Sequence, residues 1–308
     1  MSGGETLRVA VLGAGAVGCY YGGMLARAGH RVTLIGRPVH MDAIARDGLR
    51  FEARGSSEII RTDSSTSAAA VRGAQLVLFC VKSTDTEAAA TQIAPHLDAG
   101  ALVVNLQNGV DNTERIQAQL SQTVIPAAVY VATEMAGPGH LKHHGRGDLV
   151  IGSPSRDLNG KLKAWFEAAG VPIVVSDNVA GELWAKLVVN CAYNALSAIS
   201  QLPYGKLIQG RGVRDVMRDV VEETLAVAKA SGVRMAPDMM ARTWQIAEAM
   251  PAQFSSTAQD LARGKPTEID HLNGFVVQRG QALSVPTPAN RALYVLVKLL
   301  ESKPSTGI

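Results

Sequence analysis

The sequence predicts an α/β fold in its first part and an all-helical second part. Two observations support this prediction: short apolar runs alternate with helical segments up to about residue 177, and helical periodicity alone continues after it. Alternating strands and helices are typical of a parallel sheet with helices on both faces. The chain has 308 residues, more than one hydrophobic core usually holds. We therefore expect two domains, residues 1–177 and residues 178–308.

The expected strands of the first domain are apolar and rich in β-branched residues, as buried parallel strands are. They lie at residues 7–12, 31–35, 75–81, 101–106, 124–132, 148–152 and 172–176, and a helix is expected near 85–97. The turn Ser176-Asp177-Asn178 marks the domain boundary. The helices expected beyond it lie at residues 179–200, 212–231, 238–249, 253–262, 268–282 and 288–302.

Composition and charge argue against several classes of protein. Hydrophobic residues make up 47% of the chain and charged residues 19%, which indicates a globular chain rather than a disordered one. The net charge of +3 is too small to favour nucleic acid as the main ligand. No segment has the length of uncharged apolar sequence that a membrane span needs, and the first residues do not resemble a signal peptide. Cys19, Cys80 and Cys191 are expected to be free buried thiols, so we expect a cytoplasmic protein.

A glycine-rich turn follows the first expected strand and precedes a helix. It has the pattern G-x-G-x-x-G and reads Gly13-Ala14-Gly15-Ala16-Val17-Gly18. In this context the first glycine makes a tight turn, the second lets the backbone approach a pyrophosphate, and the third lets helix and strand pack closely. The helix N-terminus then faces the negative charge of the ligand. The motif predicts a dinucleotide-binding domain with a doubly wound sheet of the Rossmann type.

The end of the second strand indicates which dinucleotide binds. NAD-binding chains usually place an acidic residue there to bind the ribose 2′-hydroxyl. This chain instead has Gly36-Arg37-Pro38 and no acidic residue between 31 and 41. A guanidinium matches a 2′-phosphate in charge and geometry, so Arg37 favours NADP(H) as the cofactor. The alternative is that Arg37 is a solvated loop residue.

Two further polar positions follow strands of the same sheet. Lys82 comes directly after the strand at 75–81, and Asn108-Gly109 follows the strand at 101–106. Ligands of doubly wound sheets bind at the carboxyl ends of the strands, which makes both positions candidate ligand contacts. Both also fit ordinary turn residues.

One expected helix of the second domain carries a polar stripe on an otherwise apolar surface. Lys186, Asn190 and Asn194 are spaced four residues apart, which places them on one face of the helix over 179–200. Because a buried amide needs a hydrogen-bond partner, the stripe predicts a lined cavity. A narrow solvated stripe is the alternative.

A second polar cluster lies at residues 255–274. Glu268 follows Pro266 and Thr267 at an expected helix start, where its carboxylate could hold a lysine ammonium or simply stabilise the helix N-terminus. His140 and His144 have the spacing of metal ligands on a helix. The glycines around them predict a hairpin instead, so no metal site is expected.

These residues together resemble the ketopantoate reductase (2-dehydropantoate 2-reductase) family over essentially the whole chain. The resemblance rests on GAGAVG at 13–18, Arg37, Lys82, Gln107-Asn108-Gly109, the lysine helix, SSTAQD at 255–260, TEIDHLNG at 267–274 and PTPAN at 286–290. It implies an oxidoreductase of pantothenate and coenzyme A biosynthesis that reduces a small 2-keto acid with NADPH. A homodimer is left open. Two departures affect the substrate: SSTAQD where the family often has SSMLQD, and Gln253 where some members have Asn.

The resemblance also implies roles for individual residues. Lys186 would protonate the ketone oxygen, and Glu268 would bind the same oxygen and orient the lysine. Asn190 and Asn194 would line the substrate pocket, and Ser256 would bind the substrate carboxylate. Asn108 would contact substrate and nicotinamide, with Lys82 near the cofactor. The alternatives are a β-hydroxyacid dehydrogenase, which lacks a TEID-like segment, and a non-catalytic NADPH-binding regulator.

Overall fold

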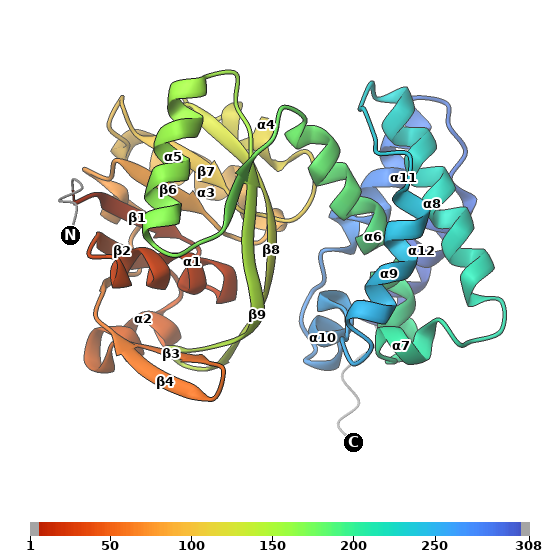
Figure 1. The fold of residues 1–308 in the computed structure, drawn as a ribbon, viewed down its shortest axis with the longest axis horizontal. Coiled ribbons are helices and arrows are strands. Elements are labelled where there is room, and N and C mark those ends of the chain that lie inside the picture. Colours follow the sequence, from red (N-terminus) through yellow and green to blue (C-terminus); the bar gives the residue numbers. More distant parts are fainter. Residues whose placement is uncertain (1–5, 303–308) are drawn as a thin grey trace. The chain divides into compact units, whose positions relative to one another are not determined.

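The computed structural model describes residues 6–302 and divides the chain into two compact units. The first unit extends to Val179 and the second begins at Ala180. Figure 1 shows strands and helices in the first unit and helices in the second. Within the described residues, no helix has the length and apolar character needed to cross a bilayer.

The first unit is built on six parallel strands, and their order confirms the predicted fold class. In space they follow the order β5-β2-β1-β6-β7-β8, which is the 3-2-1-4-5-6 order of a doubly wound sheet. Their bounds are β1 (Arg8–Leu12), β2 (Arg31–Ile35), β5 (Asp63–Ser65), β6 (Leu76–Phe79), β7 (Leu102–Asn105) and β8 (Val124–Gly137). The strand order reverses between β1 and β6, and ligands of such sheets bind at that point.

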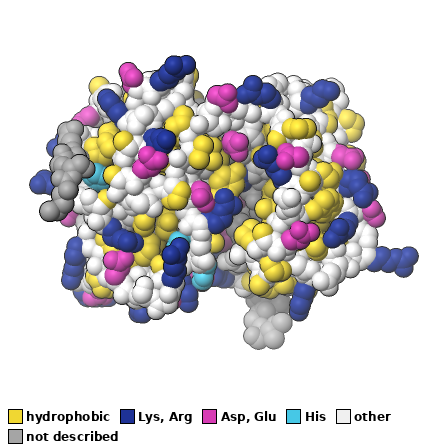
Figure 2. All heavy atoms as spheres, viewed as in Figure 1, with side chains coloured by type: hydrophobic (Ala, Val, Ile, Leu, Met, Phe, Trp, Pro, Cys, Tyr) yellow, Lys and Arg dark blue, Asp and Glu magenta, His cyan; other side chains and the backbone are white. Residues whose placement is uncertain are grey.

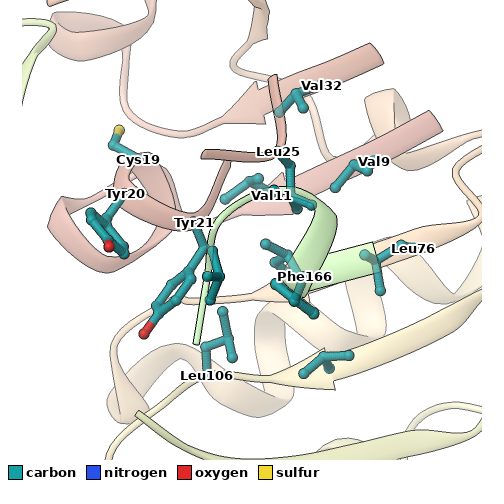
Figure 3. Packing of buried hydrophobic residues seen from close by; sticks show 14 of the residues in the cluster. Val9, Val11, Cys19, Tyr20, Tyr21, Leu25, Val32, Leu76, Leu106 and Phe166 are labelled. Atoms are coloured by element: carbon teal, nitrogen blue, oxygen red, sulfur yellow. The ribbon is translucent and has the colours of Figure 1, made fainter. Parts of the chain in front are cut away.

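Both faces of this sheet are buried, because successive residues of β1 belong to two different cores. Val9 and Val11 pack with helices α1 (Ala16–Arg27) and α5 (Arg156–Ala168). Figure 3 shows Val11 of β1, Leu25 of α1 and Phe166 of α5 in this core cluster. The intervening residues of β1 pack against α3 (Thr86–Ile93) and α4 (Asn112–Gln117) on the other face.

The sheet continues past β8 as a mixed extension that the sequence did not fully predict. The strands expected at 124–132 and 148–152 are parts of one long antiparallel hairpin, β8 with β9 (His140–Ile151). The hairpin predicted around the histidines is confirmed, with Gly139 at a φ of +63°. The neighbouring β3 (Leu49–Ala53) and β4 (Ser56–Ile60) were missed because β4 is almost entirely exposed and lacks an apolar face. The last strand, β10 (Ile173–Val175), pairs with β9.

The remaining elements of the first unit are short. The helix after β2 is α2 (Pro38–Asp47). Single 3-10 turns make up the rest of its helical structure: η1 (Ala68–Val71), η2 (Ser83–Asp85) and η3 (Ala94–His96).

The second unit is helical throughout its described residues, as predicted. Its helices are α6 (Val179–Ser200), α7 (Tyr204–Leu207), α8 (Val213–Ala230), α9 (Met239–Ala249), α10 (Ser256–Ala262), α11 (Asn273–Ala282) and α12 (Pro288–Glu301). One expected helix, residues 268–282, is wrong at its start. A 3-10 turn, η4 (Ile269–His271), comes first, and Leu272 with φ −114° and ψ −105° separates it from α11. Tertiary contacts of the TEID segment, described below, hold this conformation.

Candidate active site

The three glycines of the G-x-G-x-x-G turn have different surroundings, and those of Gly13 and Gly18 match the predicted tight turn and close helix packing. Gly13 has a φ of +94°, and a Cβ there would lie 2.5 Å from the backbone N of Val81. A Cβ at Gly18 would lie 2.5 Å from the carbonyl oxygen of Gly13, so α1 packs directly on the turn. Gly15, in contrast, is exposed and has no atom within 4 Å of its Cβ position. This open approach to the backbone fits a dinucleotide pyrophosphate.

The glycine turn is fixed to the end of β2, next to Arg37. The backbone N–H groups of Gly13 and Ala14 both donate to the carbonyl of Ile35, at 2.9 and 2.8 Å. Arg37 is the N-cap residue of α2, and its side chain is exposed. The guanidinium has no ion pair with any other residue between 6 and 302. An exposed cation beside the turn suits the 2′-phosphate of NADP(H).

Lys82 and Asn108 lie in the loops after two adjacent strands, β6 and β7. Lys82 is exposed and Asn108 is half-buried. The glycine turn, Arg37, Lys82 and Asn108 therefore follow four neighbouring strands at one edge of the sheet. This edge includes the point where the strand order reverses.

The predicted polar stripe lies on α6, half of whose residues are buried. Asn194 is 3% exposed, whereas Lys186 and Asn190 are half-buried. Neither amide side chain hydrogen-bonds to another described residue. Neither amide is among the buried side-chain atoms of the described residues that lack a partner, so the polar atoms of both remain accessible to solvent or to a ligand. The lined cavity and the solvated stripe both remain predictions for this face of α6.

Helix α10, which carries Ser256, is attached to the same part of α6. The hydroxyl of Ser255 donates to the carbonyl of Asn194 at 3.1 Å, and the backbone N–H of Ser255 donates to Ser197 Oγ at 3.3 Å. Ser255 also caps α10 by accepting from the backbone N–H of Ala258 at 3.0 Å. Because Ser255 is buried in these contacts, the next residue, Ser256, is the exposed serine of the pair.

The segment that carries Glu268 is anchored on both sides of that residue. On one side the backbone N–H of Thr267 donates to Glu301 of α12 at 2.8 Å. On the other side Asp270 accepts hydrogen bonds from Tyr294 at 2.7 Å and from Lys298 at 2.9 Å. These contacts leave Glu268 half-buried at the N-cap position of η4, outside the first turn of α11.

The same segment is also tied to α6. The amide of Asn273 donates to the carbonyl of Cys191 at 3.2 Å. Trp184 of α6 makes an edge contact with the ring of Phe275 at 5.8 Å. The lysine helix, the serine turn and the glutamate segment are thus brought together within the second unit, whereas the glycine turn, Arg37, Lys82 and Asn108 belong to the first.

Several polar residues at the carboxyl edge were not predicted from the sequence as part of the site. Gln107, Asn112, Ser83 and Thr86 form a buried network between the loops after β6 and β7. Gln107 belongs to the motif Gln107-Asn108-Gly109, but Ser83, Thr86 and Asn112 are scattered along the chain and no sequence pattern identifies them.

The remaining titratable groups do not suggest a different chemistry. Cys19, Cys80 and Cys191 are free thiols, as expected. Burial raises the pKa of Cys19 to about 12 and raises the pKa of Cys80 and Cys191 further, so none is a reactive thiolate at neutral pH. Between residues 6 and 302 no cluster of His, Cys, Asp or Glu could hold a metal ion. On the face shown in Figure 2, acidic and basic side chains are interspersed.

These features define the class of the protein, an NADP(H)-dependent oxidoreductase. The first unit has a doubly wound sheet with a glycine turn and an arginine after β2, and the helical second unit carries a lysine-and-amide stripe. Comparison with known families gives the same result. The profile of the family "Ketopantoate reductase PanE/ApbA" matches residues 9–156, and that of its C-terminal part matches residues 178–301. The chain belongs to the ketopantoate reductase family.

Individual relatives agree with this assignment. The 2-dehydropantoate 2-reductase of Halobacterium salinarum is 34% identical, with 96% of this chain and 99% of the relative covered. That of Pyrococcus horikoshii is 33% identical, with 96% and 98% covered. A crystal structure of a PanE/ApbA family ketopantoate reductase from Ralstonia eutropha is 60% identical, with a TM-score of 0.93 and 96% and 98% of the two chains covered. A D-mandelate dehydrogenase structure, at 24% identity and a TM-score of 0.90, shares the fold.

Proposed function

We propose that this protein reduces 2-dehydropantoate (ketopantoate) to pantoate with NADPH, a step towards pantothenate and coenzyme A. The observation that supports the proposal best is the stripe Lys186, Asn190 and Asn194 on α6, with two amides that no described residue satisfies, in a chain of this family. The unit up to Val179 binds the cofactor and the unit from Ala180 supplies the catalytic residues. The reaction takes place in the cytoplasm.

The protein has two tasks, to orient the ketone and to supply a proton. NADPH supplies the hydride when it is bound. Lys186 donates its Nζ proton to the ketone oxygen, because that oxygen gains negative charge as the carbon is reduced. Glu268 binds the same oxygen in its hydroxyl form and orients the ammonium. The anchors of the TEID segment, Glu301 and Asp270, keep Glu268 in place from either side.

The remaining candidate residues recognise the rest of the substrate and the cofactor. Ser256 donates a hydrogen bond to the carboxylate. Asn190 and Asn194 bind the distal hydroxyl, which satisfies amides that otherwise lack partners. Asn108 contacts substrate and nicotinamide. In the first unit the pyrophosphate binds to the backbone of the glycine turn, Gly13, Ala14, Gly15, Ala16, Val17 and Gly18. Arg37 binds the 2′-phosphate, and Lys82 lies near the cofactor.

The test measures NADPH consumption across a panel of 2-keto acids. The panel contains ketopantoate, 2-ketoisovalerate, which lacks the distal hydroxymethyl group, pyruvate, and benzoylformate, the 2-keto acid that corresponds to mandelate. An unmet buried amide costs about 1–3 kcal/mol. We therefore expect ketopantoate to exceed 2-ketoisovalerate at least about tenfold in kcat/KM. The Lys186→Ala variant should lower kcat by about 100-fold or more.

Three outcomes would contradict parts of the proposal. Equal rates on ketopantoate and 2-ketoisovalerate would show that the amide stripe does not read the hydroxyl. Preference for benzoylformate would make the protein an aryl 2-keto acid reductase on the same fold. NADPH binding without oxidation by any acid of the panel would indicate a non-catalytic NADPH-binding protein.

A further inference from the structure

A buried polar network connects the loops after β6 and β7 at the carboxyl edge of the sheet. Ser83 after β6, Thr86 at the start of α3 and Asn112 at the start of α4 are each 0% exposed, and Gln107 is 5% exposed. Buried polar side chains destabilise a fold unless they are hydrogen-bonded, so a network of four in loops next to the candidate cofactor site needs an explanation.

Asn112 is the centre of this network. Its Nδ2 donates to the carbonyl oxygen of Asn108 at 2.6 Å and to Ser83 Oγ at 3.0 Å. Its Oδ1 accepts from Thr86 Oγ1 at 3.2 Å and from Arg115 Nη1 at 2.7 Å. Both donor positions of the amide are used and Arg115 occupies one acceptor position, while the single proton of Thr86 Oγ1 is shared between Asn112 Oδ1 and the carbonyl of Ser83, at 3.0 Å. One side chain therefore fixes the backbone of Asn108 relative to the loop after β6.

The network also reaches the glycine turn. Gln107 Nε2 donates to the carbonyl of Val81 at 3.0 Å and to Thr86 Oγ1 at 2.8 Å. Val81 is the residue whose backbone closes against Gly13. Continuous contacts thus run from the turn that receives the pyrophosphate to Asn108. The rigid polar network fixes the relative positions of three loop segments at this edge.

Arg115 strengthens this arrangement from outside. It binds Asn112 Oδ1, donates from Nη2 to the carbonyl of Ser83 at 2.9 Å, and forms an ion pair with Glu87 at 2.7 Å. The side chain of Arg115 is only 20% exposed, so the pair is partly shielded from water. Because Arg115 holds Asn112 Oδ1, the amide nitrogen Nδ2 of Asn112 faces Asn108 and Ser83.

We propose that Asn112 is a positioning residue for the reduction: it places Asn108 for its contacts with substrate and nicotinamide. The proposal rests on the role proposed for Asn108 above. Asn112 acts through the backbone carbonyl of Asn108 and touches neither ligand itself. Small displacements of a contact residue reduce catalysis strongly, since about 1 Å of misplacement can cost 100-fold.

The test compares Asn112→Asp with a matched control, Asn159→Asp. Aspartate keeps the acceptors for Thr86 and Arg115 but loses both donors, including the one to Asn108. Asn159 is a similarly buried amide of the same unit, 7% exposed, that donates to the carbonyl of Ser153 at 2.9 Å, away from the carboxyl-edge loops. The assay measures Tm, NADPH affinity, and kcat and KM on the best 2-keto acid of the panel.

We expect Asn112→Asp to lower kcat at least about tenfold, with a Tm loss similar to that of Asn159→Asp, which should keep kcat within about twofold. The deciding measurement is a double-mutant cycle with Asn108→Ala. If Asn112 acts through Asn108, Asn112→Asp should lower kcat less than twofold further in that background. Equal losses of kcat in both backgrounds, or equal kcat for Asn112→Asp and Asn159→Asp, would overturn the proposal.

A second variant covers the case in which Asn112→Asp does not fold. Thr86→Val keeps the side-chain shape and removes the hydroxyl that bonds Asn112, Gln107 and the carbonyl of Ser83. It should lower kcat about threefold or more, and the loss should again disappear in the Asn108→Ala background. Unchanged kcat would contradict the proposal. Wild-type protein that oxidises no NADPH would fail the proposed function itself, and this proposal with it, before any variant is made.

Discussion

A methyl group added at Gly15 meets different surroundings from one added at Gly18, and this difference gives a sharp test of the cofactor site. At position 15 no atom lies within 4 Å of the new Cβ, and φ is −88°, which alanine adopts freely. At position 18 the Cβ would lie 2.5 Å from the carbonyl oxygen of Gly13 and 2.8 Å from a methyl group of Val11. The first variant should affect binding and the second should affect folding.

The magnitudes follow from these distances. Overpacking at Gly18→Ala costs about 1–3 kcal/mol, and the better helix propensity of alanine offsets about 1 kcal/mol of that cost. A net loss of roughly 1 kcal/mol lowers Tm by about 2–4 °C for a unit of this size. Gly15→Ala should leave Tm unchanged or slightly higher, because alanine reduces the conformational entropy of the unfolded chain.

Gly15→Ala should weaken NADPH binding although it leaves Tm nearly unchanged. If the pyrophosphate approaches the backbone at this open position, a methyl group there costs about 1–3 kcal/mol of binding, or roughly 5- to 150-fold in Kd. Thermal unfolding without cofactor and titration of nucleotide fluorescence measure the two effects separately. A Gly15→Ala variant that binds NADPH within twofold of wild type, or one that unfolds like Gly18→Ala, would refute the assignment of the turn.

Two further predictions concern charges. Arg37→Asp should lower the NADPH-to-NADH ratio of kcat/KM at least about tenfold, because it removes a phosphate partner and adds a like charge; Arg31→Asp, at the other end of β2, is the control, and an equal change in both would contradict the assignment. Burial acts to raise the pKa of Glu301, but hydrogen bonds from Lys298 and Thr267 outweigh it and lower that pKa. Because the pKa is lowered in the folded state, the stabilisation is present above the ordinary value of 4.5 and is lost as the pH falls below it. Glu301→Gln should therefore reduce the free energy of unfolding at pH 7 by about 0.5–1 kcal/mol, with the difference from wild type shrinking in denaturant titrations below pH 4.5; a difference independent of pH would disprove it.

Local patterns carry much of the fold because they depend on neighbours along the chain. The apolar runs of β1, β6 and β7 are buried on both faces and read as strands without knowledge of their partners. The helical period of α6 and α12 similarly predicts which faces are buried. By contrast, β4 was missed because its residues are mostly exposed and only pairing with β3 makes them a strand.

The sequence by itself determined the alternation of strands and helices, the three distinct glycines, the arginine after β2 and the lysine stripe of α6, whereas β5 and the strand order came from the structure. The features that the sequence determined depend on spacing over a few residues, where backbone geometry is fixed by chain connectivity. Only the tertiary structure decided that Glu268 precedes a 3-10 turn rather than opening a helix, because its anchors Glu301 and Asp270 are paired with residues 24 or more positions away. It alone revealed Asn112, because a buried amide is distinguished from a loop residue by the partners that surround it in space, and those partners come from separate loops.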